Sequence, residues 1–216
     1  MKLSEKTLQV LKNFSNINQS ILIRPGNVIK SVTELKTIFA RAEVPETFEQ
    51  EFAIYDLPQF LGTISLFSDP ELDFHEKYVT IHSGKQRVNY TYANPELFTV
   101  APSKEINFPE TNINFNLSRE QLQTVIKAYG VLQAPQIAIV GEDNVISIRA
   151  INSKDSTGNM FSLDVGESTE DFTVIIRPEY LLKFISADYE VSLTTQGISR
   201  FSTDGFTYWV ATDAPK

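Results

Sequence analysis

The stretch NINFNLSREQLQTVIKAYG, residues 112–130, holds a strand pattern, a helix start and a helix in a single run. In its first six residues, apolar side chains alternate with asparagine, which is the two-residue period of a half-buried strand. Ser118, followed three residues later by Gln121, matches the capping box that begins many helices. The stretch therefore predicts a strand that passes directly into a helix.

The predicted helix has one apolar face and one polar face. Its apolar residues recur at the spacing of an amphipathic helix, and a stripe that includes two cations lies opposite them. The apolar face consists of Leu122, Val125, Ile126 and Tyr129, and the polar stripe consists of Arg119, Gln123 and Lys127. This pattern is typical of a helix that covers a sheet and turns its charges outward.

Three other stretches follow the same plan of a cap or turn followed by apolar residues at helical spacing. They are LSEKTLQVLKNFSNI (3–17), IYDLPQFLGTISLFS (54–68) and IIRPEYLLKFIS (175–186). The four stretches recur at intervals of about 50 to 60 residues, a spacing that indicates repeated architecture. The runs between them are rich in β-branched and aromatic residues and are broken by turn sequences. We predict four modules, each of one strand, one helix and three strands.

Local signals place the other helix starts. Ser4 is a predicted cap for the first helix, and Asp56 followed by Pro58 begins the second. Pro178 stands where a first-turn proline is tolerated. The fourth helix is predicted to be short, with Leu182 on its apolar face.

The modules pair into domains of an α+β fold. Two modules make a half-chain of roughly 100 residues, an ordinary domain size. The stretch TVAPSKEINFPET (99–111) has two prolines and no helical period, so it is predicted to be an extended connector. We predict an N-terminal domain over 1–99, a connector over 100–111 and a C-terminal domain over 112–216.

Composition excludes several classes of protein. The chain lacks cysteine, so it has no disulfides or thiol chemistry, and it shows no signal peptide or membrane-spanning run. It contains no P-loop, dinucleotide-binding glycine motif or nucleophile motif, so we predict no enzyme activity and no cofactor. His75 and His82, with Asp73 and Glu76 nearby, lack the spacing of a standard metal motif, and we predict no metal site.

The formal net charge of −8 argues against nucleic-acid binding, but the charge is distributed unevenly. The four helical stretches together carry a small excess of lysine and arginine, so the strands and loops hold the acidic excess. One interpretation is that these cations are ordinary solvated residues. The other is that the helices share one side of curved sheets and turn weak positive charge toward a polyanion.

Three segments, MKLSEKTLQVLKNFSNINQSI, FAIYDLPQFLGTISLF and VAPSKEINFP, closely resemble the DNA polymerase sliding clamps of T-even-type phages. The resemblance covers most of the chain in the same order. It implies two DNA-clamp (PCNA-like) domains, and three subunits that close head to tail into a ring with helices lining the hole. It also implies a processivity factor that encircles duplex DNA, without sequence preference, and tethers the replicative DNA polymerase.

The resemblance further implies an ATP-dependent clamp loader as a partner, a role in phage late transcription, and a location in the cytoplasm of the infected bacterial host. No membrane association is expected. The competing interpretation is a non-catalytic β-rich binding protein or a virion structural protein, which would have no need for helical stripes of one sign.

Sites follow from the resemblance residue by residue. The residues expected to face DNA are Lys2, Lys6, Lys12, Arg119, Lys127, Arg177 and Lys183. The expected subunit contact joins RVNYTYA (87–93) to MFSLDV (160–165) through Arg87, Tyr90, Tyr92, Met160, Phe161 and Leu163. A cleft for partner peptides is expected near Val100, Pro102, Phe108 and Val210. Ordinary packing of strand aromatics and connector residues is the alternative for the last two sets.

Overall fold

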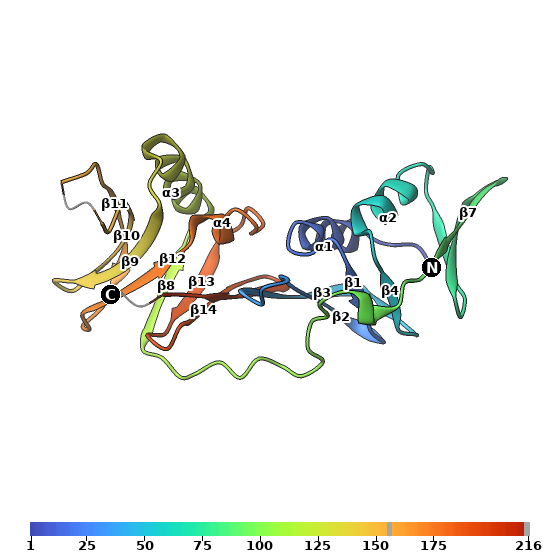
Figure 1. Cartoon of the computed structure of the whole chain (residues 1–216), viewed down its shortest axis with the longest axis horizontal. Helices are drawn as coiled ribbons and strands as arrows, with labels where there is room; N and C mark the ends of the chain where they lie inside the picture. Colours follow the sequence, from blue (N-terminus) through green and yellow to red (C-terminus); the bar gives the residue numbers. More distant parts are fainter. Residues whose placement is uncertain (155–156, 214–216) are drawn as a thin grey trace. The chain divides into compact units, whose positions relative to one another are not determined.

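The computed structural model describes residues 1–154 and 157–213, and the chain divides into two compact units, Met1–Glu105 and Ile106–Lys216 (Figure 1). The division falls inside the segment 100–111 that the sequence predicts as a connector. The domain limits at residues 99 and 112 stay predictions. Both units combine helices with antiparallel sheets, which confirms the α+β class.

The elements of unit 1 follow the order of two modules. They are α1 (Glu5–Ser15), β1 (Ile21–Ile23), β2 (Gly26–Val32), β3 (Ile38–Phe48), β4 (Phe52–Ile54), α2 (Leu57–Ile64), β5 (Glu71–Phe74), β6 (Tyr78–Ser83), β7 (Gln86–Thr91) and the 3-10 helix η1 (Pro95–Leu97). The second of these modules, β4 to β7, has the predicted order of one strand, one helix and three strands.

The elements of unit 2 repeat that order twice. They are β8 (Ile113–Leu117), α3 (Arg119–Leu132), β9 (Gln136–Glu142), β10 (Val145–Ile151), β11 (Phe161–Glu167), β12 (Phe172–Ile176), α4 (Pro178–Leu181), β13 (Tyr189–Leu193), β14 (Ile198–Thr203) and β15 (Phe206–Ala211).

Within unit 2, each module gives its first strand to the sheet of the other module. β12 pairs antiparallel with β9, and β8 pairs antiparallel with β13. The remaining strands follow as meanders, in the orders β11-β10-β9 and β13-β14-β15. The exchange ties the two modules into one folding unit, because neither module has a complete sheet of its own.

Unit 1 repeats the exchange, with one difference from the sequence prediction. β4 pairs with β1, as the exchange requires. Residues 1–4, which precede α1, form no strand. The Met1 amino group donates to the Leu72 carbonyl and the Leu72 amide donates to the Met1 carbonyl, both at 2.8 Å. Two hydrogen bonds therefore join this segment to β5.

The helices cover one side of the strands in their own unit (Figure 1). α1 packs against β3 and α2, and it buries Val10, Leu11 and Phe14, as its apolar pattern predicts. α3 packs against β10 and β11 through Leu122 and Val125. The polar stripes of these helices therefore face away from the strands.

The fourth helix is short, as predicted, but one of its expected residues is misplaced. α4 begins at Pro178, is one turn long and ends at Leu181. Leu182 consequently lies beyond the helix with a 54% exposed side chain, so its predicted place on the apolar face is wrong. None of the described helices combines the length and hydropathy needed to span a lipid bilayer.

Candidate functional site

The start of α1 is fixed by its cap and by a carboxylate from β3. The Ser4 hydroxyl accepts a hydrogen bond from the Thr7 amide at 3.2 Å, which confirms the predicted cap. Glu46 accepts hydrogen bonds from the Ser4 amide and the Thr7 hydroxyl. Burial would raise the pKa of Glu46, but these hydrogen bonds outweigh burial and hold the pKa below its usual value. The anchored carboxylate sets the direction in which α1 presents its lysines.

The start of α3 is fixed in a related way. Ser118 and Gln121 form the complete capping box, with the Gln121 amide donating at 3.1 Å and the Ser118 amide donating at 2.8 Å. The Asp188 carboxylate accepts from the Arg119 amide at 2.6 Å. The first amides of the helix are therefore paired, and the exposed stripe has a defined orientation.

Four predicted DNA-facing cations lie exposed on these two helices. They are Lys6 and Lys12 on α1 and Arg119 and Lys127 on α3. Among the described residues, none of the four forms an ion pair, and every ion pair lies outside the helices. Lys30, Arg41 and Arg149 on the strands are instead paired with carboxylates of their own unit. The helical cations thus remain available to an external anion. α2 has no lysine or arginine.

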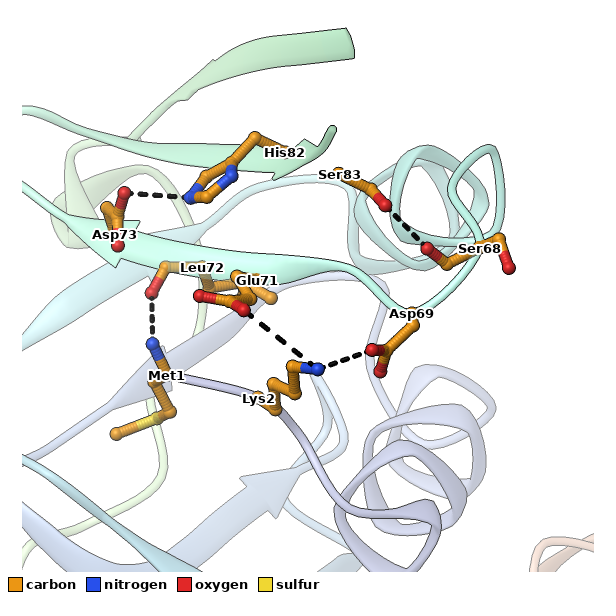
Figure 2. A network of polar contacts seen from close by, with 9 residues as sticks. All are labelled: Met1, Lys2, Ser68, Asp69, Glu71, Leu72, Asp73, His82 and Ser83. Atoms are coloured by element: carbon orange, nitrogen blue, oxygen red, sulfur yellow. Dashed lines mark hydrogen bonds and ion pairs between the residues drawn. The ribbon is translucent and has the colours of Figure 1, made fainter. Parts of the chain in front are cut away.

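Lys2 is placed differently from the other predicted cations. Its ammonium group points toward the start of β5, where it forms an ion pair with Asp69 and lies 3.9 Å from Glu71 (Figure 2). The hydrogen bond to Asp69 raises the pKa of Lys2. Its charge is therefore already balanced by carboxylates of the same unit.

The two remaining predicted cations flank α4. Arg177 is exposed at the position before Pro178. Lys183 is half-buried just after the helix, and its amide donates to the Tyr180 carbonyl at 3.1 Å. The shortness of α4 separates these two charges from any continuous helical stripe.

The predicted subunit-contact residues lie on or beside edge strands. Among the described residues of unit 1, β7 pairs only with β6, and within the described part of unit 2, β11 pairs only with β10. Phe161 and Leu163 on β11 are half-buried, Met160 just before it is 59% exposed, and Arg87 on β7 is exposed. Each unit thus presents a strand with one open edge and incompletely covered apolar side chains.

Tyr90 and Tyr92 also have partners inside unit 1. The Tyr90 hydroxyl donates to the Asp56 carbonyl and to Gln59, both at 3.1 Å, and its ring meets Phe60 edge-on. Tyr92 stacks on Phe52 with ring centroids 5.3 Å apart. Burial raises the pKa of both phenols. Tyr90 and Tyr92 therefore pack within unit 1, independently of any contact with a second subunit.

The predicted peptide-cleft residues are not equally accessible. Phe108 is half-buried and lines a cavity of about 560 Å³ in unit 2 together with Arg200. Val100 is half-buried and Pro102 is exposed in unit 1. Val210 is completely buried, because it lies on β15 facing the core of unit 2, so we leave it out of the proposed cleft.

Sequence reasoning missed Arg200, which contacts Phe108. It lies on β14 in a run whose alternation predicts only a strand, so its partner on the connector is not visible in the sequence. It also missed Glu46, because nothing in the sequence near this strand residue indicates that its carboxylate accepts hydrogen bonds from the first residues of α1. The described residues contain no cluster of three or more potential metal ligands, and His82 instead pairs with Asp73 at 2.9 Å.

The fold defined by these units is that of the DNA clamps. A solved structure of proliferating cellular nuclear antigen from Entamoeba histolytica superimposes with a TM-score of 0.71 at 13% identity, covering 95% of this chain and 94% of that one. At that identity, the likeness concerns the fold alone.

Sequence comparison identifies the family. The profile for DNA polymerase processivity factors matches residues 2–97, and the profile for the C-terminal part of the gp45 sliding clamp matches residues 114–214. The sliding clamp of Vibrio phage KVP40 is 36% identical over 99% of this chain and its own full length. The sliding clamp of Enterobacteria phage T4 is 31% identical over 99% of this chain and 97% of its own. The chain belongs to the sliding-clamp family of phage DNA polymerase processivity factors.

Proposed function

We propose that three copies of this chain close head to tail into a ring around duplex DNA, with the helices facing the duplex. The observation that supports this arrangement is the division of the cations. Those on α1 and α3 are exposed without ion pairs among the described residues, while Lys30, Arg41 and Arg149 on the strands are paired with carboxylates. An acidic protein can surround a polyanion if its unpaired cations line the hole.

The chemistry of these contacts suits a clamp that moves along DNA. Lysine and arginine contacts to phosphate position a protein without reading sequence. Each such contact adds salt-dependent affinity, so a few exposed cations per subunit hold the ring near the duplex without fixing it at one place. In this proposal Lys6, Lys12, Arg119 and Lys127 face DNA. Arg177 and Lys183 contribute at the edges, and the ion-paired Lys2 contributes least.

The subunit contact in this proposal joins β7 of one subunit to β11 of the next. Each strand offers an open edge, and pairing two open edges satisfies backbone groups that would otherwise invite uncontrolled association. A head-to-tail contact uses two different surfaces and forms a closed ring when the rotation per subunit fits. Phe161, Leu163 and the rings of Tyr90 and Tyr92 would then gain cover from the neighbouring subunit.

The ring in this proposal works through partners and has no catalytic activity of its own. The replicative polymerase docks a peptide at the Phe108 cavity, an ATP-dependent loader opens and closes the ring, and late transcription factors use the same docking surface. All of this takes place in the cytoplasm of the infected host. Phe108→Ala should therefore weaken binding of the polymerase peptide. If Phe108 only packs against its own unit, the same substitution should leave that binding unchanged.

The mass of the chain in solution tests the ring. Native mass spectrometry should give a species about three times the 24.4 kDa of one chain. After loading onto nicked circular DNA by the loader, the ring should stay bound in high salt and be released when the circle is cut. A monomer at micromolar concentration, or complexes that survive linearisation, would favour a β-rich binding or structural protein instead.

A further inference from the structure

Arg200 on β14 has a positive charge that no carboxylate of the described part of unit 2 balances. Its guanidinium carbon lies 4.8 Å from the centre of the Phe108 ring, and one terminal nitrogen donates to the Ser192 hydroxyl at 3.0 Å. Among the described residues, no carboxylate oxygen lies within ion-pair distance of this guanidinium. The Nε–H group is buried and has no hydrogen-bond partner.

The Arg200 guanidinium has fewer hydrogen-bond partners than a partly buried arginine usually has. The guanidinium stays charged and has five N–H donors, and buried donors are nearly always paired. Arg149 on β10 shows how the same unit completes a similar residue, because its nitrogens donate to the Glu142 carboxylate at 3.0 Å and the Ser147 hydroxyl at 2.9 Å. Arg200 has the hydroxyl but lacks the carboxylate.

The guanidinium lies in a cavity of a size suited to part of a peptide. The cavity measures about 560 Å³ and is lined by residues 108–112, Asn114 and Arg200. Two of the lining residues, Phe108 and Pro109, have apolar rings, and they line the cavity together with the guanidinium of Arg200. Binding sites for peptides and small ligands commonly combine an apolar wall with a few polar groups that fix orientation.

The threonine and asparagine side chains of the cavity have hydrogen-bond partners within unit 2. The Thr111 hydroxyl donates to the Leu193 carbonyl, and the Asn114 amide group donates to the Thr111 carbonyl at 3.2 Å. The Asn112 amide group donates to Glu170 at 3.5 Å. Glu110 also lines the cavity, is exposed, and forms no ion pair with Arg200. Arg200 is therefore the charged donor available to a ligand, and Glu110 opposes an anion.

We propose that Arg200 binds a carboxylate of the partner peptide whose apolar side chain packs on Phe108. The inference rests on the peptide cleft proposed above and adds its chemical specificity, an acidic group beside an apolar one. Guanidinium–carboxylate pairs are among the stronger hydrogen-bonded contacts in proteins, and stacking on Phe108 holds the guanidinium in place before the peptide arrives. An aspartate or glutamate side chain and a C-terminal carboxylate share this chemistry.

Peptide binding to the full-length clamp tests the proposal. The probe is a fluorescent peptide of the last twelve residues of the replicative polymerase from the same phage. A second version carries glutamine or asparagine in place of its acidic side chains, and a third carries a C-terminal amide. Arg200→Gln should weaken the first peptide about tenfold, the effect of removing one partner of a charge-assisted hydrogen bond. The version that lacks the relevant carboxylate should bind as weakly and should no longer respond to Arg200→Gln.

Two further variants separate this role from a structural one. Glu110→Gln should tighten binding of the acidic peptide about twofold, because it removes the opposing charge, and loss of packing does not produce a gain. Arg149→Gln is the matched control, since it removes an arginine of the same unit away from the cavity, and it should leave binding unchanged. Arg200→Lys should recover only part of the affinity, because lysine lacks the planar fork.

The outcomes are distinguishable. If the peptide fails to bind the unmodified clamp, the proposed cleft is wrong. If it binds with equal affinity to the Arg200→Gln variant, or if that variant weakens the neutral peptides as much as the acidic one, the cleft stands and the role of Arg200 is refuted. If Arg200→Gln alters only the salt dependence of DNA binding, the residue contacts phosphate and the proposal is also refuted.

Discussion

The Glu46 carboxylate gives a quantitative test of how the helix that presents Lys6 and Lys12 is held. We predict that Glu46→Gln lowers the free energy of unfolding by about 2 kcal/mol at pH 7. The amide oxygen can still accept from one of the two donors, so one hydrogen bond to a charged group is lost, worth about 1.5 kcal/mol after allowance for partial exposure. The negative charge at the start of α1 adds about 0.3–1 kcal/mol.

The pH dependence has a definite sign. Hydrogen bonds hold the pKa of folded Glu46 below its usual value, so its stabilisation is present above the unfolded pKa of about 4.3 and is lost as the pH falls through the folded value. The difference between wild type and the variant should therefore be largest at pH 7 and should become smaller as the pH falls through the folded pKa of Glu46. Urea unfolding followed by circular dichroism, at one fixed protein concentration, measures both differences.

Two controls make this test specific. Glu49→Gln changes an exposed carboxylate just after the end of the same strand and should alter stability by less than about 0.5 kcal/mol. Thr7→Val removes the buried hydroxyl that donates to Glu46, and its effect should be less than additive with that of Glu46→Gln. A loss of equal size at pH 7 and pH 3, or fully additive effects, would refute the reasoning.

Three further predictions concern DNA, the ring and the core. Replacing the exposed cations of α1 and α3 by glutamine should make the slope of log affinity for DNA against log salt less steep, as measured by salt titration. The expected change is about 0.9 for each phosphate that the proposed ring no longer neutralises. Leu163→Asp should convert the proposed trimer to monomers in native mass spectrometry, because the carboxylate would be buried in the proposed subunit interface. Gly141→Ala should cost at least about 3 kcal/mol of unfolding free energy in urea denaturation, since the new Cβ would lie 2.4 Å from the Phe172 ring and 2.6 Å from the Glu170 carbonyl.

Each of these three substitutions has a control variant for which we expect a different result. Arg149→Gln removes a cation that is already paired and should leave the salt slope unchanged. Ser162→Asp places a carboxylate on the exposed side of the same edge strand and should leave the proposed trimer intact. Gly62→Ala, in α2 with open space around it, should raise stability by about 0.5–1 kcal/mol. Each prediction is contradicted if the control variant shows the expected change and the test variant with which it is paired does not.

The helix starts and the module order were predictable because they depend on local chemistry. The capping box at Ser118 and the cap at Ser4 use side chains within three residues of the groups they bond. The apolar spacing that predicts the buried faces of α1 and α3 is likewise contained in a few turns. Such features are visible in a single sequence because they need no knowledge of the rest of the chain.

Features that depend on distant residues could not be predicted. Lys2 has the same local appearance as Lys6, but Asp69 and Glu71, far along the chain, neutralise it. The sequence predicts a short fourth helix with Leu182 on its apolar face, yet α4 ends at Leu181 and Leu182 is exposed. Val210 was expected at a surface, and only the strand register shows that it faces the core. In each case the deciding interaction comes from another element.

The exchange of first strands between modules affects which recombinants of related genes can fold. A crossover between related genes that falls between β1 and β4, or between β9 and β12, would join a ladder from two parents, and its strands would have to match in register and side-chain size. A crossover in the connecting segment near Glu105 leaves both ladders of each half with a single ancestor. The half-chain, rather than the module, is therefore the segment within which an exchanged strand and its partner are inherited together.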